Sequence, residues 1–266
     1  MLGAIYGDIA GSVYEFRNLK SKNAPLFING CRFTDDTVMT VAVADALLQT
    51  EDAANHIETF KKNLIASMHK HGRTHIRAGY GRNFFDWILY KCTESYQSYG
   101  NGSAMRVSPV AWYAKTPEEV IRLAEASAAV THDHPEGVKG AVAVALAIYL
   151  ARNGAYQEDI KAYIGKYYYP MDFTLNEIRP TYRFNETCQG SVPQALEAFF
   201  EATGFEDTIK NAISIGGDSD TIAAIAGSVA EAYFGMTEMQ TSIALSYLTK
   251  DLYDVVTRFH EKIRLA

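Results

Sequence analysis

The spacing of apolar residues constrains the fold of this chain more than any other feature. Apolar side chains recur at intervals of three and four positions along most of the length, and no segment shows sustained alternation of apolar and polar residues. A repeat of three to four positions places side chains on one face of an α-helix, whereas alternation is typical of a half-buried strand. The sequence therefore predicts an all-α fold.

The periodic segments predict where the helices lie. We expect helices at residues 2–16, 37–49, 53–70, 103–113, 117–130, 136–153, 156–167, 191–202, 206–214, 220–234 and 238–262. Residues 17–33 and 168–190 contain prolines and lack the pattern, so we predict long loops, which in compact domains are usually functional or mobile.

Length and composition predict one large folding unit. With 266 residues and 48% hydrophobic content, the chain can bury a full core. No linker, low-complexity tract or solenoid-period repeat marks a boundary. The longest apolar stretch, Gly140 to Ala151, is shorter than the ~20 residues that span a bilayer, so we expect a buried helix and no membrane partner. We therefore predict a single compact multi-helix domain over residues 1–266, which we expect to be monomeric.

Charge and cysteine content limit the partners and the compartment. The net charge of -6 gives no polycationic footprint, so the charge does not support a nucleic-acid partner. Cys31, Cys92 and Cys188 are odd in number and widely spaced, which favours a reducing compartment. The apolar N-terminal segment lacks the basic region of a secretory signal and includes Asp8. We expect a cytoplasmic enzyme.

Two short acidic clusters, at residues 34–37 and 218–221, carry most of the functional information. They read Thr-Asp-Asp-Thr and Asp-Ser-Asp-Thr, and each adjoins a predicted helix. Helix capping selects the same residue types and is the alternative interpretation. Capping needs only one acceptor, however, and Gly216 and Gly217 place the second cluster on a tight turn before a small-residue helix. If the fold brings both clusters together, their carboxylates repel one another unless cations lie between them, so we predict a two-metal site.

The first predicted helix contains a glycine face and two acids. Gly3, Gly7 and Gly11 are four apart, which places them on one face and permits close helix packing. Asp8 and Glu15 are seven apart, so on a continuous helix they also share a face. A metal site would explain an acid near the C-terminal end of a helix, and a solvated surface position for Glu15 is the alternative.

Three further features are compatible with an anionic ligand. The glycine turns at residues 79–81 and 100–103 could present backbone amides, and the second leads into a predicted helix. Such turns are common in ordinary proteins. His132 lies at the start of another predicted helix, where it could stack on a ligand, act as a base or lie on the surface.

Taken together and in this order, these motifs resemble the ADP-ribosylglycohydrolase family. The resemblance covers residues 2 to 235. It is carried by Gly7-Asp8-x-x-Gly11-Ser12-x-Tyr14-Glu15, Phe33-Thr34-Asp35-Asp36-Thr37, Gly100-Asn101-Gly102-Ser103-Ala104-Met105-Arg106, Thr131-His132-x-His134-Pro135 and Ile215-Gly216-Gly217-Asp218-Ser219-Asp220-Thr221.

The resemblance implies an all-α fold in which a cleft with a binuclear Mg²⁺ or Mn²⁺ centre binds ADP-ribose. The metal ligands that it implies are Thr34, Asp35, Asp36, Asp218, Asp220 and Thr221. The residues that it places around the diphosphate and distal ribose are Gly79, Gly81, Asn101, Gly102 and Ser103, with His132 near the adenosine or phosphate end.

The same resemblance implies hydrolysis of the glycosidic bond between ADP-ribose and an acceptor on a protein or other conjugate. Glu15 is the expected proton carrier, with Asp35 or Asp36 as alternatives. Arginine is the favoured acceptor, and serine, an O-acyl ester and a nucleic-acid base remain open. A non-catalytic ADP-ribose-binding module and a two-metal phosphohydrolase are the rival interpretations.

Overall fold

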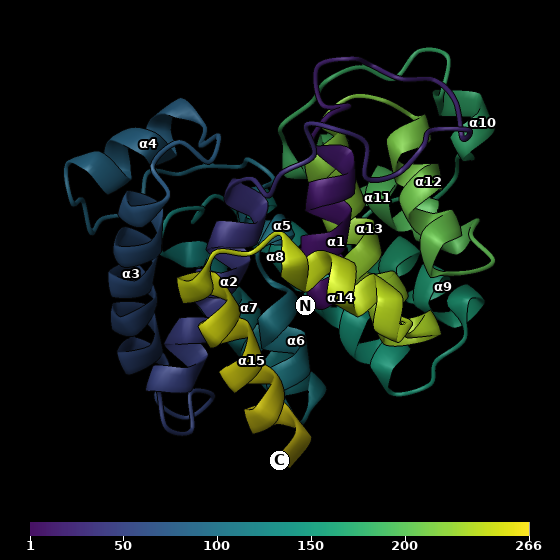
Figure 1. Cartoon of the computed structure of the whole chain (residues 1–266). Coiled ribbons are helices and arrows are strands. Elements are labelled where there is room, and N and C mark those ends of the chain that lie inside the picture. Colours follow the sequence, from purple (N-terminus) through teal and green to yellow (C-terminus); the bar gives the residue numbers. More distant parts are fainter. Residues whose placement is uncertain (266) are drawn as a thin grey trace.

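The computed structural model describes residues 1–265, and all its regular elements in this range are helices (Figure 1). The helices are α1 (Leu2–Gly11), α2 (Asp35–Gln49), α3 (Ile57–Thr74), α4 (Arg82–Leu89), α5 (Gly102–Met105), α6 (Ser108–Tyr113), α7 (Pro117–Ala129), α8 (Pro135–Arg152), α9 (Gln157–Tyr167), α10 (Leu175–Ile178), α11 (Cys188–Phe200), α12 (Phe205–Ser214), α13 (Ser219–Phe234), α14 (Glu238–Ser246) and α15 (Lys250–Leu265). Within these residues the only β-type pairing is an isolated bridge between Gly100 and Thr187. The predicted all-α class is confirmed.

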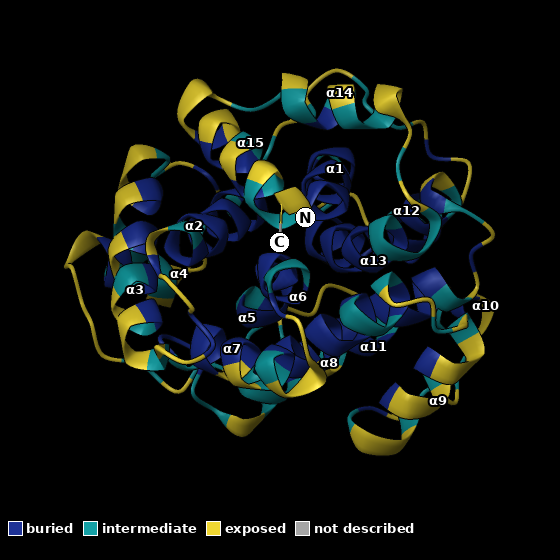
Figure 2. Ribbon diagram, turned by 90° about the horizontal axis from the view of Figure 1, so that it is seen from below, coloured by how far each residue is buried: buried dark blue, intermediate teal, exposed yellow. Residues whose placement is uncertain are grey.

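The centre of the domain is built around α1 and α13. Every residue of α1 is buried, and α13 is buried from Ser219 to Ala230. Figure 2 shows both helices as buried ribbons, surrounded by α3, α9, α14 and α15, which carry exposed faces. The core therefore places the first turn of α13, with its acidic cluster, inside the molecule.

The glycine face of α1 sets the contact between these two helices. A Cβ added at Gly7 would lie 2.1 Å from the carbonyl oxygen of Ala223, and one added at Gly3 would lie 2.1 Å from that of Gly227. Gly11 in turn faces Ser219, so the contacts move toward lower residue numbers on α13 as the numbers rise along α1. The helices therefore run antiparallel with their backbones in direct contact. This register brings the C-terminal end of α1 beside the N-terminal end of α13.

The long apolar stretch from Gly140 to Ala151 lies within α8, as predicted, and most of its residues are buried. Proline at the first helical position and His134, whose side chain accepts a hydrogen bond from the amide of Glu136, begin this helix. None of the helices described here combines the length and the apolar character that crossing a bilayer would require.

Several predicted boundaries are wrong, each for a local reason. Helix α1 ends at Gly11 instead of continuing to residue 16, because the chain turns at Ser12, whose hydroxyl donates to the carbonyl of Ile9 (2.9 Å). The predicted helix at residues 103–113 is two helices, α5 and α6. The predicted helix at residues 238–262 is also two, with a break at residues 247–249.

Two short helices were not predicted. The sequence of α4, at Arg82–Leu89, is only eight residues long, which is too short to show a clear repeat. Helix α10 lies inside the predicted loop at 168–190 and begins with a capping box between Thr174 and Glu177. Residues 17–33 contain no helix, in agreement with the predicted loop.

Candidate active site

Four segments that are distant in the sequence meet at one end of the α1–α13 pair. They are the end of α1 with the turn that follows it, the first turn of α2, the turn at residues 100–102 and the first turn of α13. They surround a cleft of about 630 Å³. The predicted site residues that line this cleft are Glu15, Asp35, Asp36, Gly79, Gly81, Asn101, Gly102, His132, Asp218, Asp220 and Thr221.

Asp8 joins α1 to the first turn of α2. Its carboxylate accepts hydrogen bonds from the backbone amide (2.9 Å) and hydroxyl (2.7 Å) of Thr34, and from the amide (3.1 Å) and hydroxyl of Thr37. The side chain is fully buried, and burial raises its pKa despite these donors. Asp8 therefore fixes the cluster at residues 34–37 against the central helix.

Sequence reasoning missed the importance of Asp8, which it treated only as a neighbour of Glu15. A signal was present, since Asp8 is the only charged residue in the otherwise apolar helix from Leu2 to Gly11. A lone carboxylate inside a fully buried helix requires strong donors or a cation.

Asp36 has a buried carboxylate oxygen that forms no hydrogen bond. Its Oδ2 accepts from the hydroxyl of Thr221 (3.2 Å), whereas its Oδ1 is buried without a hydrogen-bond partner. Burial, and then the negative charge of Asp8 and Asp220, raise the pKa of Asp36 well above its usual value. An orphaned carboxylate oxygen in this position is a ready ligand for a cation.

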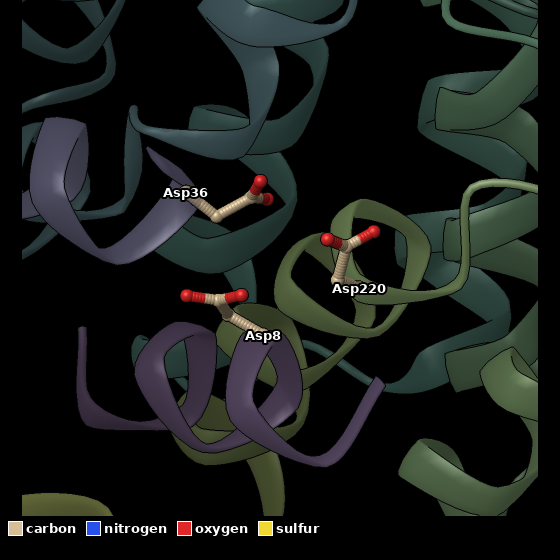
Figure 3. A group of neighbouring side chains, drawn as sticks. All are labelled: Asp8, Asp36 and Asp220. Carbon is tan, nitrogen blue, oxygen red and sulfur yellow. The ribbon is translucent and has the colours of Figure 1, made fainter. Parts of the chain in front are cut away.

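The carboxylates form two overlapping groups. Oxygens of Asp8, Asp36 and Asp220 lie within 4.8 Å of one another, and so do oxygens of Glu15, Asp218 and Asp220. Figure 3 shows Asp8, Asp36 and Asp220 pointing into one space from α1, α2 and α13. Asp220 belongs to both groups, and burial followed by repulsion from Asp218 raises its pKa well above the usual range.

No Lys, Arg or His side chain in residues 1–265 forms an ion pair with any of these carboxylates, although the same protein pairs its buried Asp45 with Lys70 and His71. Buried carboxylates without a counter-charge are costly, and clustered ones repel one another. Hard divalent cations prefer such oxygen donors. The donor set therefore fits metal ions well.

Glu15 lies beside the carboxylate cluster, but not on the helix in which it was predicted. Because α1 ends at Gly11, Glu15 lies in the turn that follows and does not share a helix face with Asp8. Its carboxylate is half-buried, and burial, with repulsion from Asp220, raises its pKa to about 7 against a smaller opposing effect of Arg32. The alternative of a solvated surface residue does not fit this position.

Asp35 and Asp218 both line the cleft and have different neighbours. Asp35 lies outside both carboxylate groups and beside Gly79, where an added Cβ would be 3.3 Å from its Oδ1. Asp218 accepts a hydrogen bond from the side-chain amide of Asn101 (2.7 Å), while burial raises its pKa to about 6. The Asn101 side chain is thus directed at the acidic cluster.

The remaining predicted residues divide into two sets. Gly81, Gly102 and His132 line the cleft, and His132 is buried, which excludes the surface alternative. The hydroxyl of Ser103 instead donates to the carbonyl of Gly137 (2.7 Å), away from the cleft. Thr34 also does not line the cleft, since its hydroxyl is held by Asp8.

Comparison with known proteins identifies the family of this chain. The ADP-ribosylglycohydrolase family model matches residues 1–265. The ADP-ribosylhydrolase ARH3 of Homo sapiens is 26% identical over 320 aligned residues, which cover 91% of this chain and 86% of that protein. The ADP-ribosylarginine hydrolase Tri1 of Pseudomonas putida is 26% identical over 90% of this chain and 70% of its own length.

A solved structure described as an ADP-ribosylglycohydrolase-related protein complex has the same fold. It superposes with a TM-score of 0.64 over 98% of this chain and 96% of its own, at 20% identity. The two proteins therefore share a helical fold although their sequences are only 20% identical. With the family model covering residues 1–265, the chain belongs to the ADP-ribosylglycohydrolase family and is an ADP-ribosyl hydrolase.

Proposed function

We propose that this enzyme cleaves the glycosidic bond between ADP-ribose and a modified acceptor with the help of two divalent cations, Mg²⁺ or Mn²⁺. The observation that carries the proposal is the pair of overlapping carboxylate groups that share Asp220 at the base of a cleft. Two groups with one common member suit two cations placed side by side.

The proposed metal ligands combine the sequence expectation with Asp8. One group supplies Asp8, Asp36 and Asp220, and the other supplies Asp218 and Asp220, with Glu15 beside them. Asp35, Thr221 and Thr34 complete the proposed set. Bound divalent ions would fix the ribose hydroxyls and lower the pKa of a water molecule.

Glu15 is the proposed proton carrier. Cleavage at the anomeric carbon builds positive character on the ribose ring, and the departing acceptor needs a proton. A carboxyl group whose pKa lies near 7 can both donate and accept a proton at neutral pH. Asp35 and Asp36 are the alternatives, but several neighbouring carboxylates repel their negative charges, which makes them better suited to holding cations.

The cleft wall next to the carboxylates is the proposed ADP-ribose site. Gly79, Gly81, Asn101 and Gly102 line it, and His132 lies behind Gly102. Because the Ser103 hydroxyl is bound to Gly137, Ser103 could contribute only through its backbone amide at the start of α5.

Arginine is the favoured acceptor. The relative from Pseudomonas putida is named an ADP-ribosylarginine hydrolase, which supports this linkage, whereas the names of the ARH3 relatives specify no acceptor. Serine, an O-acyl ester and a nucleic-acid base remain open as leaving groups. The expected monomeric state and cytoplasmic location also stay predictions.

A turnover panel tests the proposal. Arginine-, serine- and nucleic-acid-linked ADP-ribose would be incubated with the enzyme and Mg²⁺ or Mn²⁺, and the products separated by chromatography. We expect free ADP-ribose, released fastest from arginine. AMP with ribose phosphate would instead identify a phosphohydrolase, and ADP-ribose binding without turnover on any substrate would identify a binding module.

A further inference from the structure

Arg106 places an uncompensated positive charge beside the cleft. The side chain is 1% exposed and contributes to the cleft wall. Its Nη2 donates to the carbonyl of Ser127 (2.8 Å) and to the hydroxyl of Thr131 (2.9 Å), and its Nε is buried without a partner. Because neither acceptor is charged, these contacts solvate the guanidinium but do not neutralise it.

The hydrogen bonds of Thr131 fix the proton position on His132. A guanidinium can only donate, so the Thr131 oxygen accepts from Arg106. The same oxygen lies 2.7 Å from Nδ1 of His132. If Nδ1 were the donor, the hydroxyl hydrogen would have no acceptor among residues 1–265. The hydroxyl therefore donates to Nδ1, and a neutral His132 carries its proton on Nε2.

The surroundings of His132 favour the neutral form of its ring. Burial and, next, the charge of Arg106 hold its pKa well below the usual value. A neutral ring with an accepting Nδ1 has one donor left, the Nε2–H group. No protein acceptor in the described chain takes this hydrogen bond.

The glycine turn leaves room in front of this donor. A Cβ added at Gly102 would lie 3.1 Å from Nε2 of His132, and one added at Gly100 would lie 3.5 Å from it. Side chains at these positions would cover the ring nitrogen. The bare backbone of both residues therefore leaves Nε2–H facing the cleft that they line.

We propose that Arg106 and Thr131 are positioning residues that hold His132 as a neutral donor, so that its Nε2–H binds a phosphate oxygen of the ligand at the Gly100–Gly102 turn. The cleft wall would then combine carboxylates at the first turns of α2 and α13 with a neutral donor that is backed by Arg106. The identity of the ligand rests on the proposed function, whereas the tautomer of His132 does not.

Nitrogen NMR of ¹⁵N-histidine-labelled metal-free protein tests the tautomer without any ligand. The spectrum distinguishes Nε2–H from Nδ1–H rings, and a His132→Gln variant identifies the signals of this residue. We expect a neutral ring protonated at Nε2. A ring protonated at Nδ1, or at both nitrogens at neutral pH, would overturn the proposal.

A matched pair of variants tests the role of Thr131. Thr131→Val keeps the shape but removes the hydroxyl, whereas Thr131→Ser keeps the hydroxyl. We expect Thr131→Val to populate the Nδ1–H tautomer and to weaken ADP-ribose binding by about three- to thirty-fold in calorimetry, and Thr131→Ser to preserve both. Wild-type tautomer and affinity in Thr131→Val would overturn the proposal.

The two measurements separate this inference from the proposed function. An Nε2–H ring in wild-type protein that does not bind ADP-ribose would contradict the proposed ligand and leave the tautomer assignment supported. Tight ADP-ribose binding with an Nδ1–H ring would contradict the present inference and leave the proposed function supported.

Discussion

At the scale of single residues, the site is defined by which polar atoms lack a partner. Both carboxylate oxygens of Asp8 accept hydrogen bonds from Thr34 or Thr37, whereas one buried oxygen of Asp36 has no hydrogen-bond partner. Glu15 differs from both, because it is only half-buried and has a pKa of about 7. Carboxylate side chains thus serve as an anchor, a proposed metal ligand and a proposed proton carrier in one small volume.

Replacing Glu15 with Gln should separate binding from chemistry. The amide keeps the size of the side chain but cannot transfer a proton, so we expect turnover to fall by roughly 10²–10⁴-fold with ADP-ribose affinity nearly unchanged. Single-turnover rates across a metal titration check this, with the exposed Glu118→Gln as the control. Recovery at high metal concentration would make Glu15 chiefly a ligand, and an unchanged rate would return the proton transfer to Asp35 or Asp36.

Residue types in the sequence predicted much of this site, but not its contacts. The carboxylates of both acidic clusters were identified because their pattern is distinctive, and the structure brings them to one cleft. The anchoring role of Asp8 depends on a contact with Thr34, which lies twenty-six positions later in the sequence. The direction of the Ser103 hydroxyl likewise depends on Gly137, which no local pattern specifies.

At the scale of helices, the α1–α13 contact aligns the acidic turns. We expect Gly7→Ala to lower the free energy of unfolding by at least ~1–3 kcal/mol, because the new Cβ would lie 2.1 Å from the Ala223 carbonyl oxygen and force two backbones apart. Gly165→Ala in α9 is the matched control, since its Cβ would meet only Met171 at 3.8 Å. That change should be neutral or stabilising by up to ~1 kcal/mol. Equal urea midpoints for the two variants would contradict the packing argument.

The turn that follows α1 contacts the loop before α11 beside the cleft. Phe16 and Phe184 stack with ring centroids 6.2 Å apart, although 83% and 48% of their surfaces are exposed. Phe184 also lines the cleft. We expect Phe184→Ala to raise KM for a protein conjugate several-fold while ADP-ribose affinity stays unchanged, because the rim would contact the acceptor and not the nucleotide. Parallel losses for both ligands would place Phe184 on the nucleotide side.

Helix positions were predicted better than helix ends. The apolar repeat located α2, α7, α8 and α13 closely, because each is long and has a wide buried face. The end of α1 was wrong because nothing in its apolar repeat marks the turn at Ser12, whose hydroxyl contacts the Ile9 carbonyl and the Arg32 amide. Short helices such as α4 and α10 depend on tertiary contacts more than on a repeat.

At the scale of the whole molecule, stability should depend on pH through His260 in α15. Burial lowers the pKa of His260 from 6.5 to about 4, and its Nε2 has no hydrogen-bond partner. Between these values the unfolded chain binds more protons than the folded one, so this residue reduces stability as the pH falls from about 6.5 to about 4. We expect His260→Gln to gain Tm relative to the wild type across that window. A Tm difference that does not vary with pH would contradict this assignment.

The central claim is that the fold assembles a two-cation site from both ends of the chain. Because Asp220 belongs to both carboxylate groups, its loss should affect both cations, whereas Asp36 belongs to one. Asp45→Asn provides the control, since Asp45 is equally buried but is paired with Lys70 and His71.

Elemental analysis of folded protein, dialysed and reloaded with Mn²⁺, tests this claim most directly. We predict about two ions per chain in wild type and Asp45→Asn, a reduced content in Asp36→Asn, and little or none in Asp220→Asn. Only trace metal in the wild type, or full occupancy in Asp220→Asn, would contradict the account.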